Sequence, residues 1–193
     1  MKKRAICISD LASYNECCHY WEWIELPIDK ESLKERIQEI LEKGKEICIR
    51  ENGYTDSLHE EYFISDHENL PFDISEYSNP YKINEKLEDF EYLVRDETDE
   101  KVFELLKENW SYEEAIEILK EDKVIEFAEV FSEGDLARRV LESAGDLDKL
   151  PSWLHPDNID YEAILRNWNF GPFTYLVGDG FGCLLYTSPS PRD

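Results

Sequence analysis

The feature that most constrains this chain is its excess of carboxylates. Its 193 residues carry 45 Asp and Glu against 21 Lys and Arg, which gives a formal net charge of −24. A charge of this size exceeds what solubility requires of a small domain, and it repels any anionic partner. The composition therefore argues against direct binding of nucleic acid and favours a strongly basic partner.

The charge is concentrated in the middle of the chain. Residues 51–100 hold 16 acidic residues and three basic ones, and thus more than half of the net charge. Hydrophobic residues make up 41% of the chain and aromatic residues 13%. An acidic disordered segment is poor in both, because it cannot offset the entropy lost on ordering. The chain is therefore expected to fold.

Nothing in the sequence indicates export or membrane insertion. The apolar stretch after the first four residues ends at Ser9 and Asp10, and no run approaches the roughly 20 apolar residues that span a bilayer. The cysteines are odd in number, with Cys17 and Cys18 adjacent, which fits free thiols better than a disulfide framework. We expect a cytoplasmic protein without membrane contact.

The last residues differ from the rest of the chain. Residues 183–193 (CLLYTSPSPRD) match the translation of a common transposase sequencing adapter. We expect this segment to be read-through rather than native sequence.

Hydrophobic patterning divides the remainder into three sections of an α+β fold. Residues 1–60 form an α+β section, with strands at 4–9 and 20–26, a helix from Asp29 to Gly44 and a strand near 47–50. The apolar stripe of the helix consists of Leu33, Ile37, Ile40 and Leu41. Residues 61–121 are acidic and mainly helical after a strand near 61–64. Ile83, Leu87 and Phe90 form the apolar stripe of one of these helices, and Ser111 and Glu114 form the capping box of another.

Residues 122–182 return to α+β. We expect a strand over 123–131 with Ile125, Phe127 and Phe131 on one side. A helix capped by Ser132 should follow and end at Gly145, then a second helix starting near 157, and a closing strand over 173–177.

No catalytic or metal site can be identified from motifs. Cys17, Cys18 and His19 lack the second ligand pair of a zinc site, and residues 96–100 lack the glycine and the distal glutamate of a calcium loop. Residues 178–182 (GDGFG) open no helix and are expected to form a turn rather than a phosphate cradle. With 45 acidic residues, some carboxylate pairs will be close by chance, and none is picked out by an accompanying constellation of His, Ser or Cys. We therefore expect neither an enzyme nor a cofactor.

A folded body covered with carboxylates resembles the DNA backbone physically. B-DNA carries one negative charge per ~1.7 Å of axis, so a dimer of this chain would match a duplex of roughly 80 Å. Such a surface suits the basic channel of a large DNA-binding enzyme.

Several segments resemble the ArdA family of antirestriction proteins. They are residues 8–15 (ISDLASYN), 20–26 (YWEWIEL), 63–72 (FISDHENLPF), 132–138 (SEGDLAR) and 159–163 (IDYEA). The resemblance covers essentially residues 4–182. In one respect the chain departs from the family, because residues 16–19 (ECCH) replace a loop that usually contains glycine.

The resemblance implies three small domains in an elongated molecule that dimerises through its C-terminal domain. It also implies inhibition of type I restriction-modification enzymes by mimicry of B-form DNA, on behalf of a mobile genetic element. Leu136, Val140 and Leu141 would lie at the dimer interface, unless they pack within their own chain. The carboxylates that we expect on the mimic surface are Asp66, Glu68, Asp73, Glu76, Glu85, Glu88, Asp89, Glu91, Asp96, Glu97, Asp99, Glu100, Glu104, Glu108, Glu113, Glu114, Glu117 and Glu121.

Two other functions remain open at this point. The protein could be an acidic adaptor for another basic, DNA-associated protein. A glycosidase-like hydrolase would instead require a concave pocket with two carboxylates ~5 to 9.5 Å apart.

Overall fold

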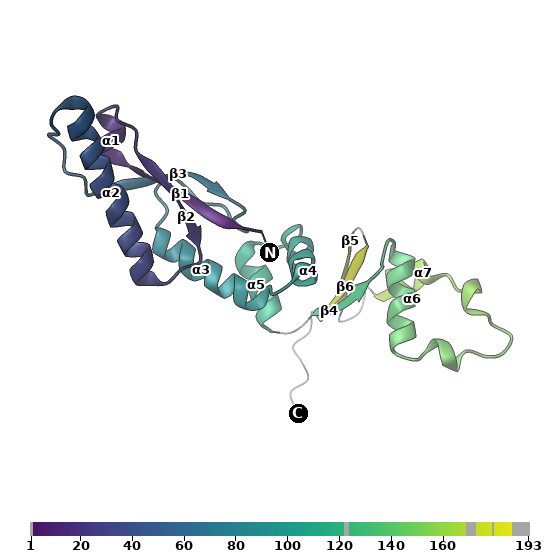
Figure 1. Ribbon diagram of the computed structural model, residues 1–193. Coiled ribbons are helices and arrows are strands. Elements are labelled where there is room, and N and C mark those ends of the chain that lie inside the picture. The colour runs from purple at the N-terminus through teal and green to yellow at the C-terminus, as the bar shows by residue number, and fades with distance from the viewer. Residues whose placement is uncertain (1, 122–123, 169–172, 179, 187–193) are drawn as a thin grey trace. The chain divides into compact units, whose positions relative to one another are not determined.

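The computed structural model describes residues 2–121, 124–168, 173–178 and 180–186 (Figure 1). The chain forms two compact units, Met1–Tyr92 and Leu93–Asp193. Each unit combines helices with one three-stranded antiparallel sheet. The predicted α+β class is confirmed, whereas the division into three domains stays a prediction.

The sheet of the N-terminal unit has β1 at its centre. Strand β1 (Arg4–Asp10) pairs with β2 (Trp21–Leu26) on one side and with β3 (Tyr62–Glu68) on the other. Every residue of β1 is buried, because both of its edges are paired and α2 packs against the sheet (Figure 1). The predicted strands at 4–9, 20–26 and 61–64 are thereby confirmed.

Helix α2 (Lys30–Asn52) begins where the sequence predicts. The Asp29 side chain accepts a hydrogen bond from the Ser32 backbone N–H at 2.9 Å, and the predicted apolar stripe from Leu33 to Leu41 is buried. The predicted helix end at Gly44 and the strand near 47–50 are wrong. The helix continues to Asn52 and ends at Gly53, whose φ of 82° only glycine adopts without strain.

Gly44 lies inside this helix and does not end it. A Cβ at this position would collide with the Asp10 carboxylate at the end of β1. The glycine therefore allows α2 to approach the sheet closely, and Cys48, one turn later, is completely buried. A glycine in a helical pattern predicted a C-cap here, because the sequence does not reveal which side chain lies opposite.

Cationic side chains link α2 to β2 around Glu22. Arg36 and Lys43 contact the Glu22 carboxylate at 2.6 and 2.8 Å, and the Tyr20 hydroxyl donates to it as well. These bonds, with that from Lys43 the largest, lower the pKa of Glu22 to about 2. Some Lys and Arg residues of this unit therefore stabilise the fold.

Two short helices complete the N-terminal unit. Helix α1 (Leu11–Asn15) follows β1 directly, and α3 (Pro80–Leu93) buries Ile83, Leu87 and Phe90 as the sequence predicts. Asn84 of α3 bonds to both the N–H and the C=O of Ile28, at 2.9 and 2.8 Å.

The C-terminal unit begins with two helices. Helix α4 (Glu97–Lys107) is followed by α5 (Tyr112–Lys120), which starts with the predicted capping box between Ser111 and Glu114. Helix α6 (Glu133–Ser143) is capped by Ser132, as predicted. Next come 3₁₀ turns at Leu147–Lys149 and Pro156–Asn158 and helix α7 (Tyr161–Trp168), which starts a few residues later than predicted.

The sheet of this unit has the order β4-β6-β5. Its strands are β4 (Val124–Ala128), β5 (Phe173–Gly178) and β6 (Phe181–Tyr186). Strand β4 is shorter than predicted, because Glu129 has a φ of 57° and interrupts the extended backbone. Phe131 is consequently exposed instead of sharing a buried face with Phe127.

Strand β6 was not predicted. The sequence predicts a turn over 178–182 and read-through over 183–193. The structure places Cys183, Leu184 and Leu185 in the central strand, where they are buried. Residues 187–193 lie outside the described residues, and the origin of the whole segment stays a prediction.

The five cysteines of the chain are free thiols, at positions 7, 17, 18, 48 and 183. In the described part of the chain, no helix is long and apolar enough to cross a membrane.

We predict that Gly44→Ala destabilises the protein. Alanine favours a helix interior by ~1 kcal/mol over glycine, but overpacking a buried contact costs ~1 to 3 kcal/mol, so the net effect should be unfavourable. Urea unfolding measures the difference. The matched control is Gly134→Ala in α6, where the nearest atom to a new Cβ is 3.4 Å away. A Gly44→Ala protein as stable as the control variant would contradict the close contact with Asp10.

Candidate functional site

The predicted acidic residues lie at the surface in both units. None of them is buried; Glu91, Asp99 and Glu100 are half-buried, and the others are exposed. In the N-terminal unit they belong to β3, the following loop and α3, and in the C-terminal unit to α4, α5 and the residues that flank them. The exposure on which a carboxylate array depends is therefore present.

The helices orient these carboxylates because their opposite faces are buried. In α4, Val102, Phe103 and Leu106 are almost completely inaccessible, and in α5 the same holds for Ala115. The acidic residues between them must point outward, since a helix with one buried stripe presents its other side to solvent. Glutamate is also a strong helix former, so a dense acidic face is compatible with the helices.

Some of these carboxylates also stabilise the fold. Asp96 caps α4 by accepting the N–H groups of Thr98 and Asp99 at 2.8 and 2.9 Å. Glu114 completes the capping box of α5, and bonds from Ser111 lower its pKa. Glu91 pairs at 3.1 Å with Arg4, whose side chain is buried. Substitutions at these positions would combine structural with functional effects.

Glu126 on β4 joins the acidic surface, although the sequence does not single it out. Burial, followed by the charges of Asp99 and Asp96, raises the pKa of this carboxyl. Its proximity to the start of α4 arises from tertiary packing, so no local motif could have revealed it. Glu126 is thus a carboxylate whose ionised form is disfavoured by burial and by neighbouring like charges.

The residues predicted for a dimer interface lie on α6 and pack within their own chain to different degrees. Leu136 is completely buried in a core with Val130, Ala137, Leu165 and Leu184. Val140 packs against this core, and Leu141 is half-buried. For Leu136 the intramolecular alternative therefore applies, and the dimer interface stays a prediction.

A hollow of about 420 Å³ lies on the N-terminal sheet. Tyr14, Trp21, Trp23 and Phe63 line it. Among the described residues that line it, Asp66 is the only one with a carboxylate. A single carboxylate does not form the pair that a glycosidase-like reaction requires.

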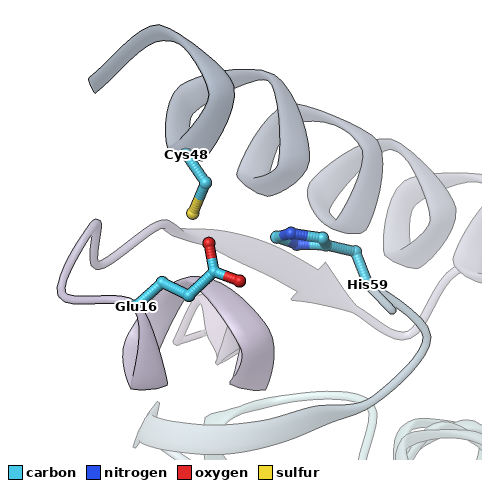
Figure 2. Close-up of side chains that lie close together, drawn as sticks. All are labelled: Glu16, Cys48 and His59. Atoms are coloured by element: carbon cyan, nitrogen blue, oxygen red, sulfur yellow. The ribbon is translucent and has the colours of Figure 1, made fainter. Parts of the chain in front are cut away.

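A polar cluster lies at the C-terminal end of β1. Glu16, Cys48 and His59 come from different segments, yet their ligand atoms lie within 4.8 Å of one another (Figure 2). Cys18 contacts Cys48. Cys17 and His19, its neighbours in sequence, are exposed and have φ values of 62° and 47°, which are costly for residues other than glycine.

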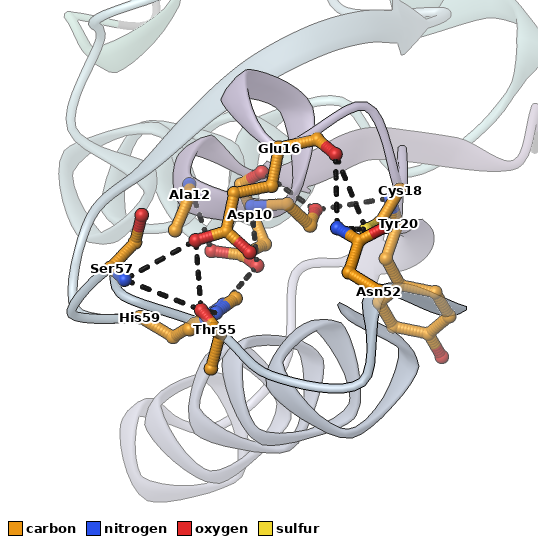
Figure 3. Close-up of polar contacts among 10 residues, drawn as sticks. Asp10, Ala12, Glu16, Cys18, Tyr20, Asn52, Thr55, Ser57 and His59 are labelled. Carbon is orange, nitrogen blue, oxygen red and sulfur yellow. Dashed lines mark hydrogen bonds and ion pairs between the residues drawn. The ribbon is translucent and has the colours of Figure 1, made fainter. Parts of the chain in front are cut away.

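Hydrogen bonds connect this cluster (Figure 3). The Thr55 hydroxyl lies 2.8 Å from Glu16 Oε1 and 3.1 Å from His59 Nε2, and the Ser57 N–H donates to Glu16 Oε1. Bonds from Ser57 and Thr55 lower the pKa of Glu16, whereas burial and then the neighbouring Cys18 raise the pKa of Cys48. No sequence motif reveals this cluster, because Glu16, Cys48 and His59 are distant along the chain.

We predict that Glu126→Gln stabilises the protein at pH 7. The folded pKa of this carboxyl is raised above its ordinary value of 4.5, so the folded state binds the proton more tightly than the unfolded state. Ionised Glu126 therefore costs stability at pH 7, by at most about 1 kcal/mol at this partly exposed position. The cost should disappear as pH falls below the ordinary value.

Denaturant unfolding of both proteins at pH 7 and pH 4 measures this difference. Glu35→Gln, at an exposed site on α2, is the control and should change stability little. A Glu126→Gln protein that is less stable than the parent at pH 7 would contradict the predicted cost of ionising this carboxyl.

Comparison with known proteins agrees with the family resemblance. The family described as antirestriction protein (ArdA) matches residues 6–182. No curated protein matches the chain. Since the match spans both structural units and nearly all described residues, the chain belongs to the ArdA family of antirestriction proteins.

Proposed function

We propose that this protein mimics B-form DNA and occupies the DNA-binding channel of type I restriction-modification enzymes. The observation that carries the proposal is the outward placement of carboxylates along α3, α4 and α5, above buried apolar stripes. Membership of the ArdA family supports the antirestriction role.

The proposed affinity comes from carboxylates in the places of phosphates. Lys and Arg side chains of a DNA channel would pair with them by charge-assisted hydrogen bonds. Each exposed pair is worth only ~0.2 to 1 kcal/mol, so affinity depends on many simultaneous contacts. Binding blocks the channel and needs no chemical reaction by this chain.

The proposal includes a cytoplasmic homodimer joined through the C-terminal unit. Because Leu136 is completely buried, the interface would have to use more exposed residues of the same region, such as Leu141 and Phe131. The molar mass of the purified protein in solution decides between one and two chains, independently of inhibition.

We predict that the protein inhibits DNA cleavage by a type I enzyme in a salt-dependent manner. Screening shortens the Debye length from ~10 Å at 0.1 M to ~3 Å at 1 M, so inhibition should weaken as salt rises. Cleavage and methylation by the purified enzyme are measured with increasing amounts of protein. Unimpaired cleavage at a large molar excess in low salt would contradict the proposal, and capture of a different basic protein would then favour an adaptor.

We further predict that neutralising part of the array weakens inhibition. The triple variant Glu104→Gln, Glu108→Gln and Glu117→Gln removes three exposed charges from α4, its C-terminal end and α5. Contacts of this kind should raise the half-inhibitory concentration roughly 10-fold.

The matched control removes the same number of exposed charges from α2, as Glu31→Gln, Glu35→Gln and Glu42→Gln. Inhibition by the control variant should stay close to that of the parent protein. Equal weakening in both variants would show that net charge alone matters, and would contradict an ordered mimic surface.

A further inference from the structure

The cluster of Glu16, Cys48 and His59 contains the ligand types that zinc selects. Zn²⁺ is bound by cysteine sulfur, histidine nitrogen and carboxylate oxygen, usually four in a tetrahedron. Ligand atoms of such a site lie about 3.5 Å apart, as follows from the metal–ligand distances. The three groups already lie within 4.8 Å of one another, so side-chain adjustments are enough to close the site (Figure 2).

Cys18 provides a fourth ligand next to this group. Its thiol contacts Cys48, and it lies 3.5 Å from the Glu16 carbonyl oxygen and 3.3 Å from Asn52 Nδ2. Cys18 is half-buried at the edge of the cluster, whereas Cys17 is exposed. The adjacent cysteines thus differ in their surroundings, and Cys18 interacts with Cys48. Cys18 is not among the three residues whose ligand atoms lie within 4.8 Å of one another, so its side chain must turn further inward to bind the same ion.

His59 is held in the orientation that a metal ligand requires. Its Nδ1 lies 2.6 Å from Asp10 Oδ2, and both side chains are almost completely buried. A carboxylate accepts but cannot donate, so Nδ1 donates to Asp10, and Nε2 is the ring nitrogen that faces Thr55 and the cluster. Metal binding at Nε2 requires the neutral ring. Carboxylate partners orient zinc-binding histidines in this way.

The cluster also lacks a permanent positive charge. Asp10 is bonded to two backbone N–H groups and to His59, and Glu16 to Thr55 and Ser57. In the described ranges, neither carboxylate pairs with Lys or Arg. A buried cation would therefore be favoured here.

We propose that Glu16, Cys18, Cys48 and His59 bind one zinc ion, with Asp10 orienting His59. The four ligands come from the end of α1, the loop after it, the last turns of α2 and the segment before β3. A closed site with four protein ligands stabilises structure rather than performing catalysis. Bound zinc would link residues 16–19 to α2. This structural role would be independent of the proposed DNA mimicry.

The first test measures metal bound by the intact chain. Metal-free protein is mixed with zinc chloride in the presence of excess Mg²⁺ and a competing chelator, and metal content is measured after dialysis. One zinc per chain is expected, together with a rise in the melting temperature of at least about 5 °C at saturating zinc. Failure to retain zinc under these conditions would overturn the proposal.

Cobalt substitution identifies the ligands in the unmodified protein. Co²⁺ bound to thiolates gives sulfur-to-metal charge-transfer absorption together with the visible bands of a tetrahedral ion. Both are expected here, and the charge-transfer band should fall by about half in Cys18→Ser, which leaves one thiolate. Metal bound without this absorption would assign it to the surface carboxylates and overturn the proposal.

Zinc binding by single variants distinguishes the ligands from neighbouring residues. Cys48→Ser and His59→Ala should weaken zinc binding by at least about 100-fold, because even orienting partners typically contribute 10- to 100-fold. Cys17→Ser is the matched control, adjacent in sequence and exposed, and should bind zinc like the parent. Equal losses in Cys17→Ser and Cys18→Ser would overturn the ligand set. Circular dichroism of each metal-free variant separates lost binding from lost folding.

Discussion

The N-terminal unit depends on one buried carboxylate, that of Asp10. It is the only acidic residue that is buried in the described part of the chain. Removing a charge from water costs several kcal/mol, and here bonds from Ala12, Ser13 and His59 offset that cost. The same carboxylate fixes the position of α2, because Gly44 leaves room for it. Strand β1, helices α1 and α2 and the segment before β3 therefore meet at a single side chain.

The other carboxylates are subject to the opposite constraint. They must remain solvated, so each helix that carries them needs an apolar stripe to attach it to a core, as Ile83, Leu87 and Phe90 do in α3. The acidic array is thus the outer side of ordinary amphipathic helices. At Glu126, burial and then the charges of Asp99 and Asp96 disfavour ionisation, so this carboxylate opposes stability.

Local signals in the sequence predicted much of the fold, and contacts between distant segments account for what they missed. The cap at Asp29, the capping box at Ser111 and the stripe of α3 rest on neighbouring residues, and they were confirmed. The helix end predicted at Gly44 is wrong because this glycine makes room for the side chain of Asp10, 34 positions away. The exposure of the acidic residues could likewise be predicted, whereas the cluster of Cys48 and His59 could not, since folding alone brings these residues together.

Several of the places where local rules fail lie in the N-terminal unit near Asp10. A glycine interrupts a helical pattern at position 44, two non-glycine residues, Cys17 and His19, adopt left-handed backbone, and a carboxylate and an imidazole are buried together. Each departure costs free energy on its own, so their coincidence indicates a common requirement. An array of many weak charge contacts tolerates the loss of single members, whereas a buried cluster does not. The two parts of this protein should therefore differ sharply in their tolerance of substitution: broad over the acidic helices and narrow around Asp10.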